Sequence, residues 1–250
     1  MSGHNRWSKV KRFKGAIDDK RGKLFTKIIK EITVAARMGG GDPNGNPRLR
    51  AAITIAKSSS MPRENIERAV KKGTGELEGQ AIEEIVYEGY GPGGVAVIIE
   101  TATDNKNRTV NDLRTIFKSS GGHLGEPNSV AWMFDRCGQL LFEKDKNPED
   151  KVMEVALEAG AKDVSEGDGT VDVITEVNEV YQIKEAFEKV GMHPTSSGFS
   201  YIPKSTVRVE GDNALKLLKF LEQVEEHDDV QNVHANFEMD DKLFEELTNK

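Results

Sequence analysis

Lysine and arginine crowd the first 72 residues, and cations at this density are side chains that can bind phosphate. Residues 1–72 hold 18 Lys or Arg and 6 Asp or Glu, a net charge of +12. Residues 73–250 hold 17 and 36, a net charge of −19, so the overall charge of −7 conceals two opposite parts. A solvated basic surface is the alternative, but such like charge repels itself unless a polyanion neutralises it. We therefore predict that residues 1–72 bind nucleic acid, where Lys and Arg release counterions condensed on the phosphates.

The candidate contacts are cations distributed along this segment, with two aromatic rings among the first of them. The predicted phosphate-binding residues are Lys9, Lys11, Arg12, Lys14, Lys20, Arg21, Lys23, Lys27, Lys30, Arg37, Arg48, Arg50, Lys57, Arg63, Arg68, Lys71 and Lys72. Trp7 and Phe13 are candidate stacking residues, because aromatic rings stack on bases. Arg48 and Arg50 flank a predicted helix start, where backbone N–H groups also attract phosphate.

Signals for catalysis, metal binding or small-molecule binding are weak. The five histidines and the single cysteine, Cys137, lack the spacing of zinc ligands, and a buried inert thiol is the simpler interpretation of Cys137. The glycine-rich residues 89–94 precede a predicted strand, so they predict a turn and not a phosphate loop at a helix N-terminus. No spacing singles out an acid/base pair. We expect no enzymatic activity, metal, cofactor or small-molecule substrate.

The polar run Asp104-Asn105-Lys106-Asn107-Arg108-Thr109 lies at a predicted helix start and has two interpretations. Its side chains can cap the helix. Alternatively, Lys106 and Arg108 make a second contact with a nucleic-acid backbone. We expect the rest of the acidic part to face away from a polyanion or to bind a basic protein partner.

The basic segment is predicted to be helical, because its apolar residues recur with helical spacing. The predicted helices cover residues 24–36, 47–56 and 62–72. Asn46 can cap the second helix, and Gly73 is predicted to end the third. The second and third helices have the spacing of a helix-turn-helix, although such pairs are common without any role in DNA binding. Residues 1–78 are therefore predicted to form a basic three-helix domain.

After residue 79 the pattern changes to short strands alternating with helices. Predicted strands cover residues 82–90, 95–103, 129–134, 139–143, 163–165, 171–177, 199–202, 206–209 and 230–237, and predicted helices begin near residues 105, 148, 178 and 213. Residues 136–203 have the β-α-β-β-α-β order of a ferredoxin-like domain. The sequence thus predicts a multidomain α and α+β protein, with residues 136–203 inserted into a discontinuous α+β domain of residues 79–135 and 204–250.

The N-terminus and the hydropathy pattern indicate the compartment. The first residues are basic but lack the apolar stretch of a secretory signal. No run of about 18 apolar residues occurs, so we expect no membrane partner and a cytoplasmic location.

Several motifs along the chain resemble those of the YebC/PmpR family. They are GHNRWS (residues 3–8), KRGKLFTK (20–27), GGGDP (39–43), NPRLR (46–50), MP (61–62), NIERA (65–69), KKG (71–73), YEGYGPGG (87–94) and DNKNRT (104–109). One departure is Asn5-Arg6, where the family often has Ser-Lys, and this keeps the basic charge.

The resemblance implies a helical first domain, two α+β domains and a cytoplasmic, non-enzymatic role. The family is described as probable DNA-binding transcriptional regulators. Some members, including a mitochondrial relative, are instead described as translation factors that aid ribosomes through proline-rich stretches. The resemblance therefore implies either DNA or ribosomal RNA and the ribosome as the partner.

Overall fold

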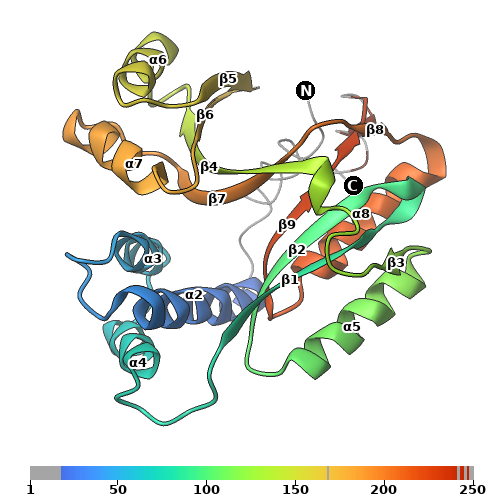
Figure 1. Cartoon of the computed structure of the whole chain (residues 1–250), viewed down its shortest axis with the longest axis horizontal. Coiled ribbons are helices and arrows are strands. Elements are labelled where there is room, and N and C mark those ends of the chain that lie inside the picture. The colour runs from blue at the N-terminus through green and yellow to red at the C-terminus, as the bar shows by residue number, and fades with distance from the viewer. Residues whose placement is uncertain (1–17, 168, 241–242, 245–246, 248–250) are drawn as a thin grey trace. The chain divides into compact units, whose positions relative to one another are not determined.

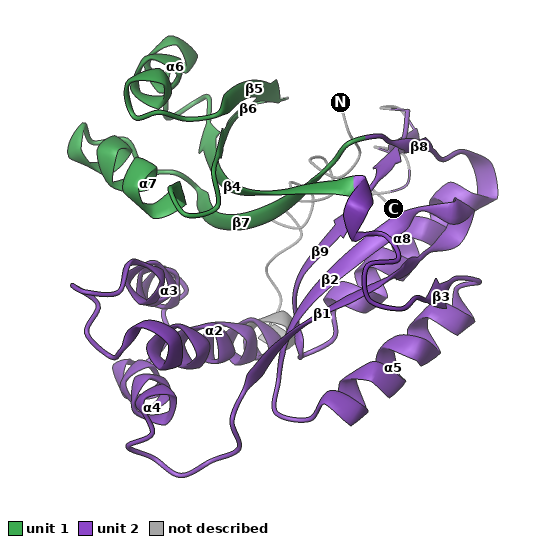
Figure 2. Cartoon of the chain, viewed as in Figure 1, with its two compact units in different colours: residues 1, 134–204 green, residues 2–133, 205–250 purple. Residues whose placement is uncertain are grey.

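The computed structural model describes residues 18–167, 169–240, 243–244 and 247, with side chains from residue 22 onward (Figure 1). Of the predicted contact residues, Trp7, Lys9, Lys11, Arg12, Phe13 and Lys14 lie outside the described residues, as do the side chains of Lys20 and Arg21. The described chain forms two compact units, residues 134–204 and the remainder (Figure 2). The division into three domains at the boundaries given above stays a prediction.

The basic segment folds as the three predicted helices. They are α2 (Asp18–Gly39), α3 (Pro47–Ser58) and α4 (Arg63–Thr74). Both α3 and α4 pack against α2, around a core that includes Ile32, Leu49 and Ile66. The helical spacing of apolar residues therefore identified the buried faces correctly.

Asn46 joins the end of α2 to the start of α3. Its side-chain oxygen accepts a hydrogen bond from the Leu49 N–H at 3.0 Å, which confirms the predicted cap. Its amide nitrogen donates to the carbonyl oxygens of Ala35 and Gly40, both at 2.8 Å. The side chain is buried with all of these bonds made, so one residue fixes the turn between two helices.

Gly73 does not end α4, contrary to the prediction. The helix continues to Thr74, and Gly75 ends it with a left-handed φ of 82°. Gly73 is instead a site of close approach between α4 and α2, because a Cβ atom there would lie 2.4 Å from the Thr33 carbonyl oxygen and 2.7 Å from Ala36 Cβ. The glycine is required for packing and not for chain reversal.

The larger unit also contains an antiparallel sheet with the strand order β3-β1-β2-β9. Its elements are β1 (Glu83–Tyr90), β2 (Ala96–Thr103), α5 (Lys106–Ser119), β3 (His123–Leu124), α8 (Gly211–Glu225) and β9 (Val230–Ala235). Side chains of α5 and α8, such as Leu113, Phe117 and Leu217, pack against Val97 and Ile99 on one face of β2. On the opposite face, Ala102 of β2 packs against Val34 of α2.

The glycine-rich residues 89–94 form the predicted turn between strands. Pro92–Gly94 is a single 3₁₀ turn (η1), and Gly93 and Gly94 have left-handed φ values of 77° and 75°. Gly89 lies within β1, where a Cβ atom would come within 2.6 Å of the His123 carbonyl oxygen. These glycines allow close packing of β1 with β3 and a tight reversal into β2.

Residues 134–204 form the second unit. Its elements are β4 (Phe134–Glu143), α6 (Glu149–Glu158), β5 (Asp163–Gly167), β6 (Thr170–Thr175), α7 (Val180–Lys189) and β7 (Ser196–Pro203), with the strand order β5-β6-β4-β7. Helices α6 and α7 cover one face of this sheet, with Val152 and Phe187 in the core. The predicted fold class, a helical domain followed by α+β domains, is confirmed.

The predicted strand over residues 129–134 is wrong. The segment before β4 is a turn followed by a 3₁₀ turn, η2 (Ala131–Met133). The buried carboxylate of Glu88 accepts hydrogen bonds from the N–H groups of Asn128, Val130 and Ala131 at 2.7–2.8 Å. These bonds satisfy backbone donors that a strand would need for pairing. Near the C-terminus, β8 (Val207–Arg208) and β10 (Phe237–Glu238) form a short parallel pair.

We predict that Gly73→Ala lowers the free energy of unfolding by about 1–3 kcal/mol, because the added methyl group overpacks the α2–α4 contact. Gly22→Ala is the matched control. It lies within α2 with no atom within 4 Å of a built Cβ, so it should raise the free energy of unfolding by about 0.5–1 kcal/mol. Urea unfolding followed by circular dichroism measures both. Equal effects would contradict the packing role of Gly73.

Candidate nucleic-acid interface

Three of the predicted cations on α2 face the turn between α8 and β9. Lys27 Nζ donates to the Glu225 carbonyl oxygen at 2.5 Å, and Lys30 Nζ donates to the Asp228 carbonyl oxygen at 2.9 Å. Lys23 Nζ lies 3.9 Å from a carboxylate oxygen of Glu226. These lysines join the helical segment to the neighbouring sheet, so their charge is already partly neutralised within the chain.

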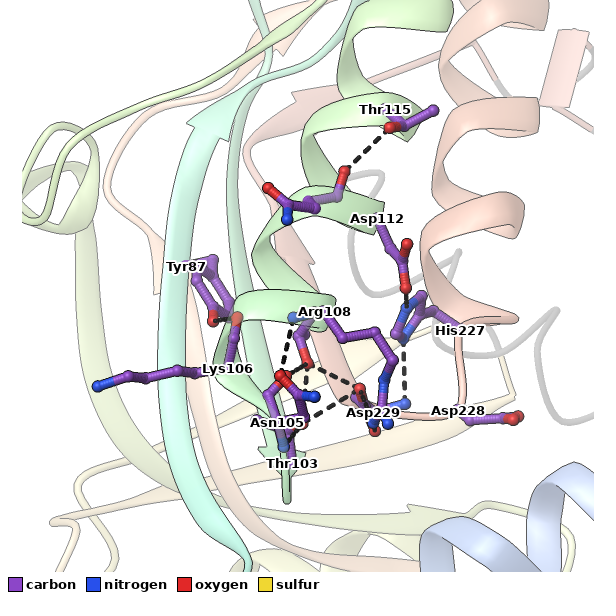
Figure 3. Close-up of polar contacts among 12 residues, drawn as sticks. Tyr87, Thr103, Asn105, Lys106, Arg108, Asp112, Thr115, His227, Asp228 and Asp229 are labelled. Atoms are coloured by element: carbon purple, nitrogen blue, oxygen red, sulfur yellow. Dashed lines mark hydrogen bonds and ion pairs between the residues drawn. The ribbon is translucent and has the colours of Figure 1, made fainter.

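Asp229 is the centre of this junction (Figure 3). Its carboxylate is almost completely buried, with 1% of the side chain exposed, and it pairs with Lys30 of α2. Arg108 Nη2 of α5 donates to its two oxygens at 2.9 and 3.1 Å. The hydroxyl groups of Thr109 and Thr103 donate at 2.7 and 3.2 Å. One carboxylate therefore holds α2, α5 and the start of β9 together.

The electrostatics keep Asp229 ionised. Burial by itself would raise the pKa of the Asp229 carboxyl, but hydrogen bonds from Lys30, Arg108 and Thr109 outweigh burial and hold its pKa well below the usual range of aspartate. The same bond to Asp229 raises the pKa of Arg108. The network is thus a charged one in which a buried carboxylate has several donors.

Arg48 is a second internal clamp. Its guanidinium binds Glu31 of α2 at 2.7 and 2.9 Å and Glu84 of β1 at 2.6 and 3.3 Å. Burial would lower the pKa of Arg48, but the hydrogen bonds to both glutamates outweigh it and raise the pKa. The sequence alone suggested that the Arg48 guanidinium binds phosphate, but in the structure it binds two carboxylates.

Two other arginines at the candidate interface pair with neighbours on α4. Arg63 Nε donates to Glu67 Oε1 at 2.6 Å, and Arg68 Nη2 donates to Asn65 Oδ1 at 3.0 Å. Both arginines are exposed, so these contacts are exchangeable at little cost. Arg50 is half-buried and donates to carbonyl oxygens of the α2–α3 loop at 3.3–3.4 Å.

The remaining cations face solvent. Within the described part of the chain, Arg37, Lys57 and Lys71 are exposed and have no carboxylate partner, and Lys72 is half-buried against Gly79. The Gly73 contact brings the last turns of α2 and α4 together, so Arg37 and Lys71 gather at one end of the helical segment. We call Arg37, Lys57, Arg63, Arg68 and Lys71 the exposed cation set.

The polar run at residues 104–109 caps α5, as one of its two interpretations predicted. Asn105 accepts a hydrogen bond from the Arg108 N–H at 3.0 Å. The Arg108 side chain turns to Asp229, whereas Lys106 points away from this network (Figure 3). The second interpretation, a nucleic-acid contact through Lys106 and Arg108, stays a prediction; Lys106 is exposed, and Arg108 is already paired within the chain.

No pattern in the sequence identified the acidic partners of these cations. Asp229, Glu31 and Glu84 are ordinary members of an acidic region, and Lys30 meets Asp229 across 199 positions of the chain. The role of Asn46 could be predicted because a helix cap depends on neighbouring residues. The roles of these carboxylates depend on contacts between distant parts of the chain and are visible only in the structure.

Other chemistry has little support in the described residues. In them, no group of three or more His, Cys, Asp or Glu side chains is arranged to hold a metal ion. Cys137 is buried, as predicted, and burial raises the pKa of its thiol to about 11. No described helix is long and apolar enough to span a bilayer.

Comparison with known proteins identifies the family. The family described as the TACO1/YebC protein N-terminal domain matches residues 5–76, and the TACO1/YebC second and third domain matches residues 82–237. The chain belongs to the TACO1/YebC family. The predicted resemblance to YebC proteins is thereby confirmed.

Relatives in the TACO1/YebC family match nearly the full length. A protein of Syntrophus aciditrophicus is 52% identical over 99% of this chain and 100% of its own. A protein of Geobacter sulfurreducens is 53% identical with the same coverage. Both are named probable transcriptional regulatory proteins. The crystal structure of a conserved hypothetical protein from Aquifex aeolicus is 46% identical and covers 91% of this chain and 94% of its own, with a TM-score of 0.85. The TACO1/YebC family is thus of a regulatory type.

We predict that Asp229→Asn lowers the free energy of unfolding at pH 7 by about 3 kcal/mol or more in this TACO1/YebC chain, because Lys30 and Arg108 lose a buried countercharge. Urea unfolding measures the loss. Asp104→Asn, which removes an exposed partner of Arg108, is the control and should cost less than about 1 kcal/mol.

The same variant should change the pH dependence of stability. A carboxyl with a depressed pKa stabilises the fold above its unfolded pKa of about 3.9, and this contribution disappears as the pH falls through its folded pKa. The wild type should therefore lose stability faster than Asp229→Asn below about pH 4. Parallel unfolding midpoints between pH 7 and pH 3 would contradict this assignment.

Proposed function

We propose that this protein is a non-enzymatic, nucleic-acid-binding regulator of gene expression that contacts phosphates through its basic helical segment. The carrying observation is the charge of this segment, +12, together with the exposed cation set on its surface. Arg48 and Lys30 are already paired with carboxylates of the same chain. The proposed phosphate contacts are therefore the exposed cations on α2, α3 and α4. Exposed cations can bind phosphate and release its counterions without breaking a buried bond.

DNA is the first candidate target, because relatives carry the name probable transcriptional regulatory protein. In this role α4 follows α3 after a short turn and presents Arg63, Arg68 and Lys71. A helix with exposed cations in this position is compatible with a helix-turn-helix.

Ribosomal RNA is the second candidate, in the role of a ribosome-associated translation factor that aids synthesis of proline-rich stretches. The observation that favours it is the mixed charge of α4, where Glu64 and Glu67 are exposed among the cations. Carboxylates on this face disfavour its burial in the major groove between two phosphate backbones. Separate cations at helix ends suit the irregular surface of a folded RNA better.

The acidic remainder suggests a further partner. Residues 73–250 carry −19 and would be repelled by a bound polyanion. We include a basic protein, such as a ribosomal protein or a regulator, as the proposed partner of this acidic part.

We predict that nucleic-acid affinity depends steeply on salt. Contacts from five cations give a fall in log K of about 4.5 per unit of log salt concentration on duplex DNA, and less on single strands. Fluorescence anisotropy with a 30-base-pair duplex and a folded ribosomal RNA fragment, between 50 and 300 mM KCl, measures the slope. A flat response for both ligands would overturn the proposed function.

The triple variant Lys57→Gln/Arg68→Gln/Lys71→Gln should reduce this slope by about 3 and weaken binding on the order of 10–100-fold. The matched control is Lys151→Gln/Lys162→Gln/Lys189→Gln, which removes three charges from residues 134–204 and should leave the slope unchanged. Equal effects of both variants would indicate dependence on net charge alone and contradict the site.

Crosslinking in cells separates the two targets. The full chain is crosslinked to bound nucleic acid, which is then purified and sequenced, with the Lys57/Arg68/Lys71 variant as background. Enrichment of promoter DNA supports transcriptional regulation, whereas enrichment of ribosomal RNA supports the translation role and rejects the first candidate.

A further inference from the structure

Helix α5 is a basic element in an otherwise acidic part of the chain. Between Lys106 and Ser119 it holds four Lys or Arg and one acid, Asp112, a net charge of +3, whereas residues 73–250 together carry −19. Such a local reversal of charge needs an explanation that the fold does not supply. The helix is buried through Thr109, Leu113 and Phe117, and Arg108, Arg114 and Lys118 lie outside that stripe.

The cations of α5 divide by what they contact. Arg108 pairs with Asp229 and Asp104. Lys106, Arg114 and Lys118 are exposed, and within the described chain none of the three has a carboxylate partner. At 100° per residue Arg114 and Lys118 lie about 40° apart on the solvent side of the helix, whereas Lys106 has the phase of the buried stripe and is exposed because it is the first residue of the helix. Arg114 and Lys118 therefore share an outward face, and Lys106 is an exposed cation at the N-terminal end of the same helix.

The single acid of α5 does not neutralise this face. Asp112 Oδ2 lies 3.2 Å from His227 Nε2, in the turn before β9, so its carboxylate is directed along the helix flank toward that turn (Figure 3). The outward charge of Lys106, Arg114 and Lys118 is thus left without internal compensation.

Neutral hydrogen-bonding side chains lie between the cations. Asn107, Asn111 and Thr115 are exposed on the same side of α5, and Arg114 Nη1 lies 3.5 Å from Asn111 Oδ1. Phosphate oxygens in nucleic-acid complexes accept hydrogen bonds from this mixture of Lys, Arg, Asn and Thr.

We propose that the exposed cations of α5, with Arg114 and Lys118 on its outer face and Lys106 at its first turn, form a second phosphate-binding surface for the same nucleic acid that the helical segment binds. This inference rests on the proposed function and extends it to a domain that is acidic as a whole. Lys30 on α2 and Arg108 on α5 share the carboxylate of Asp229, so both surfaces belong to one compact unit with a fixed spacing. Two phosphate-binding surfaces held rigidly bind one polyanion more tightly than either does alone.

The test uses the full chain with the variant Lys106→Gln/Arg114→Gln/Lys118→Gln, which leaves the bonds of Arg108 intact. Binding to the 30-base-pair duplex and to the folded RNA is measured against salt by fluorescence anisotropy. Loss of three phosphate contacts should reduce the salt slope by about 2–3 and weaken binding on the order of 10–100-fold for the ligand that is bound. Circular dichroism and the urea midpoint should match those of the wild type.

The control is again Lys151→Gln/Lys162→Gln/Lys189→Gln, which changes the net charge equally. If the α5 variant binds nucleic acid as this control does, the inference is overturned. The cations of α5 would then be only solvated or would bind an acidic protein. If the α5 variant is unchanged while the Lys57/Arg68/Lys71 variant is weakened, the proposed function stands and the second surface is rejected. If the wild type shows no salt-dependent binding at all, the proposed function itself fails.

Discussion

The buried carboxylate of Asp229 is the interaction on which the arrangement of the larger unit depends. It lies where α2, the N-terminal turn of α5 and the start of β9 converge, and Lys30, Arg108, Thr109 and Thr103 all donate to it. A charge in this position is tolerated only because the donors surround it. Its geometry sets how the helical segment meets the sheet, and through that contact the spacing of the cations on either side.

The packing at this junction also decides which cations of the basic segment are paired within the chain and which are exposed. Lys27, Lys30 and Arg48 resemble their neighbours in type, yet each is held by oxygen atoms of the same chain. Arg37, Lys57 and Lys71 remain exposed on α2, α3 and α4. Whether a cation is paired or exposed depends on which face of its helix it lies on and on which element packs against that face. A high density of Lys and Arg therefore indicates an anionic partner but does not identify the residues that contact it.

The glycine-rich motifs have a structural explanation that is independent of any ligand. Gly73 permits α4 to approach α2, and Gly89 permits β1 to lie against β3 and the ring of Phe117. Gly93 and Gly94 have left-handed φ values that reverse the chain. These glycine-rich motifs are therefore partly packing contacts, and the exposed cations are better candidates for binding.

The sequence by itself determined the helices, most of the strands, the cap at Asn46 and the opposite charges of the two parts, because each depends on local spacing or composition. Residues 129–134 escaped local prediction, since a distant carboxylate, Glu88, binds their backbone N–H groups. Only the tertiary structure decided which cations are neutralised and which face solvent. Pairs such as Lys30 with Asp229 join residues far apart in the chain, and no periodicity encodes a contact between two elements that meet only after folding.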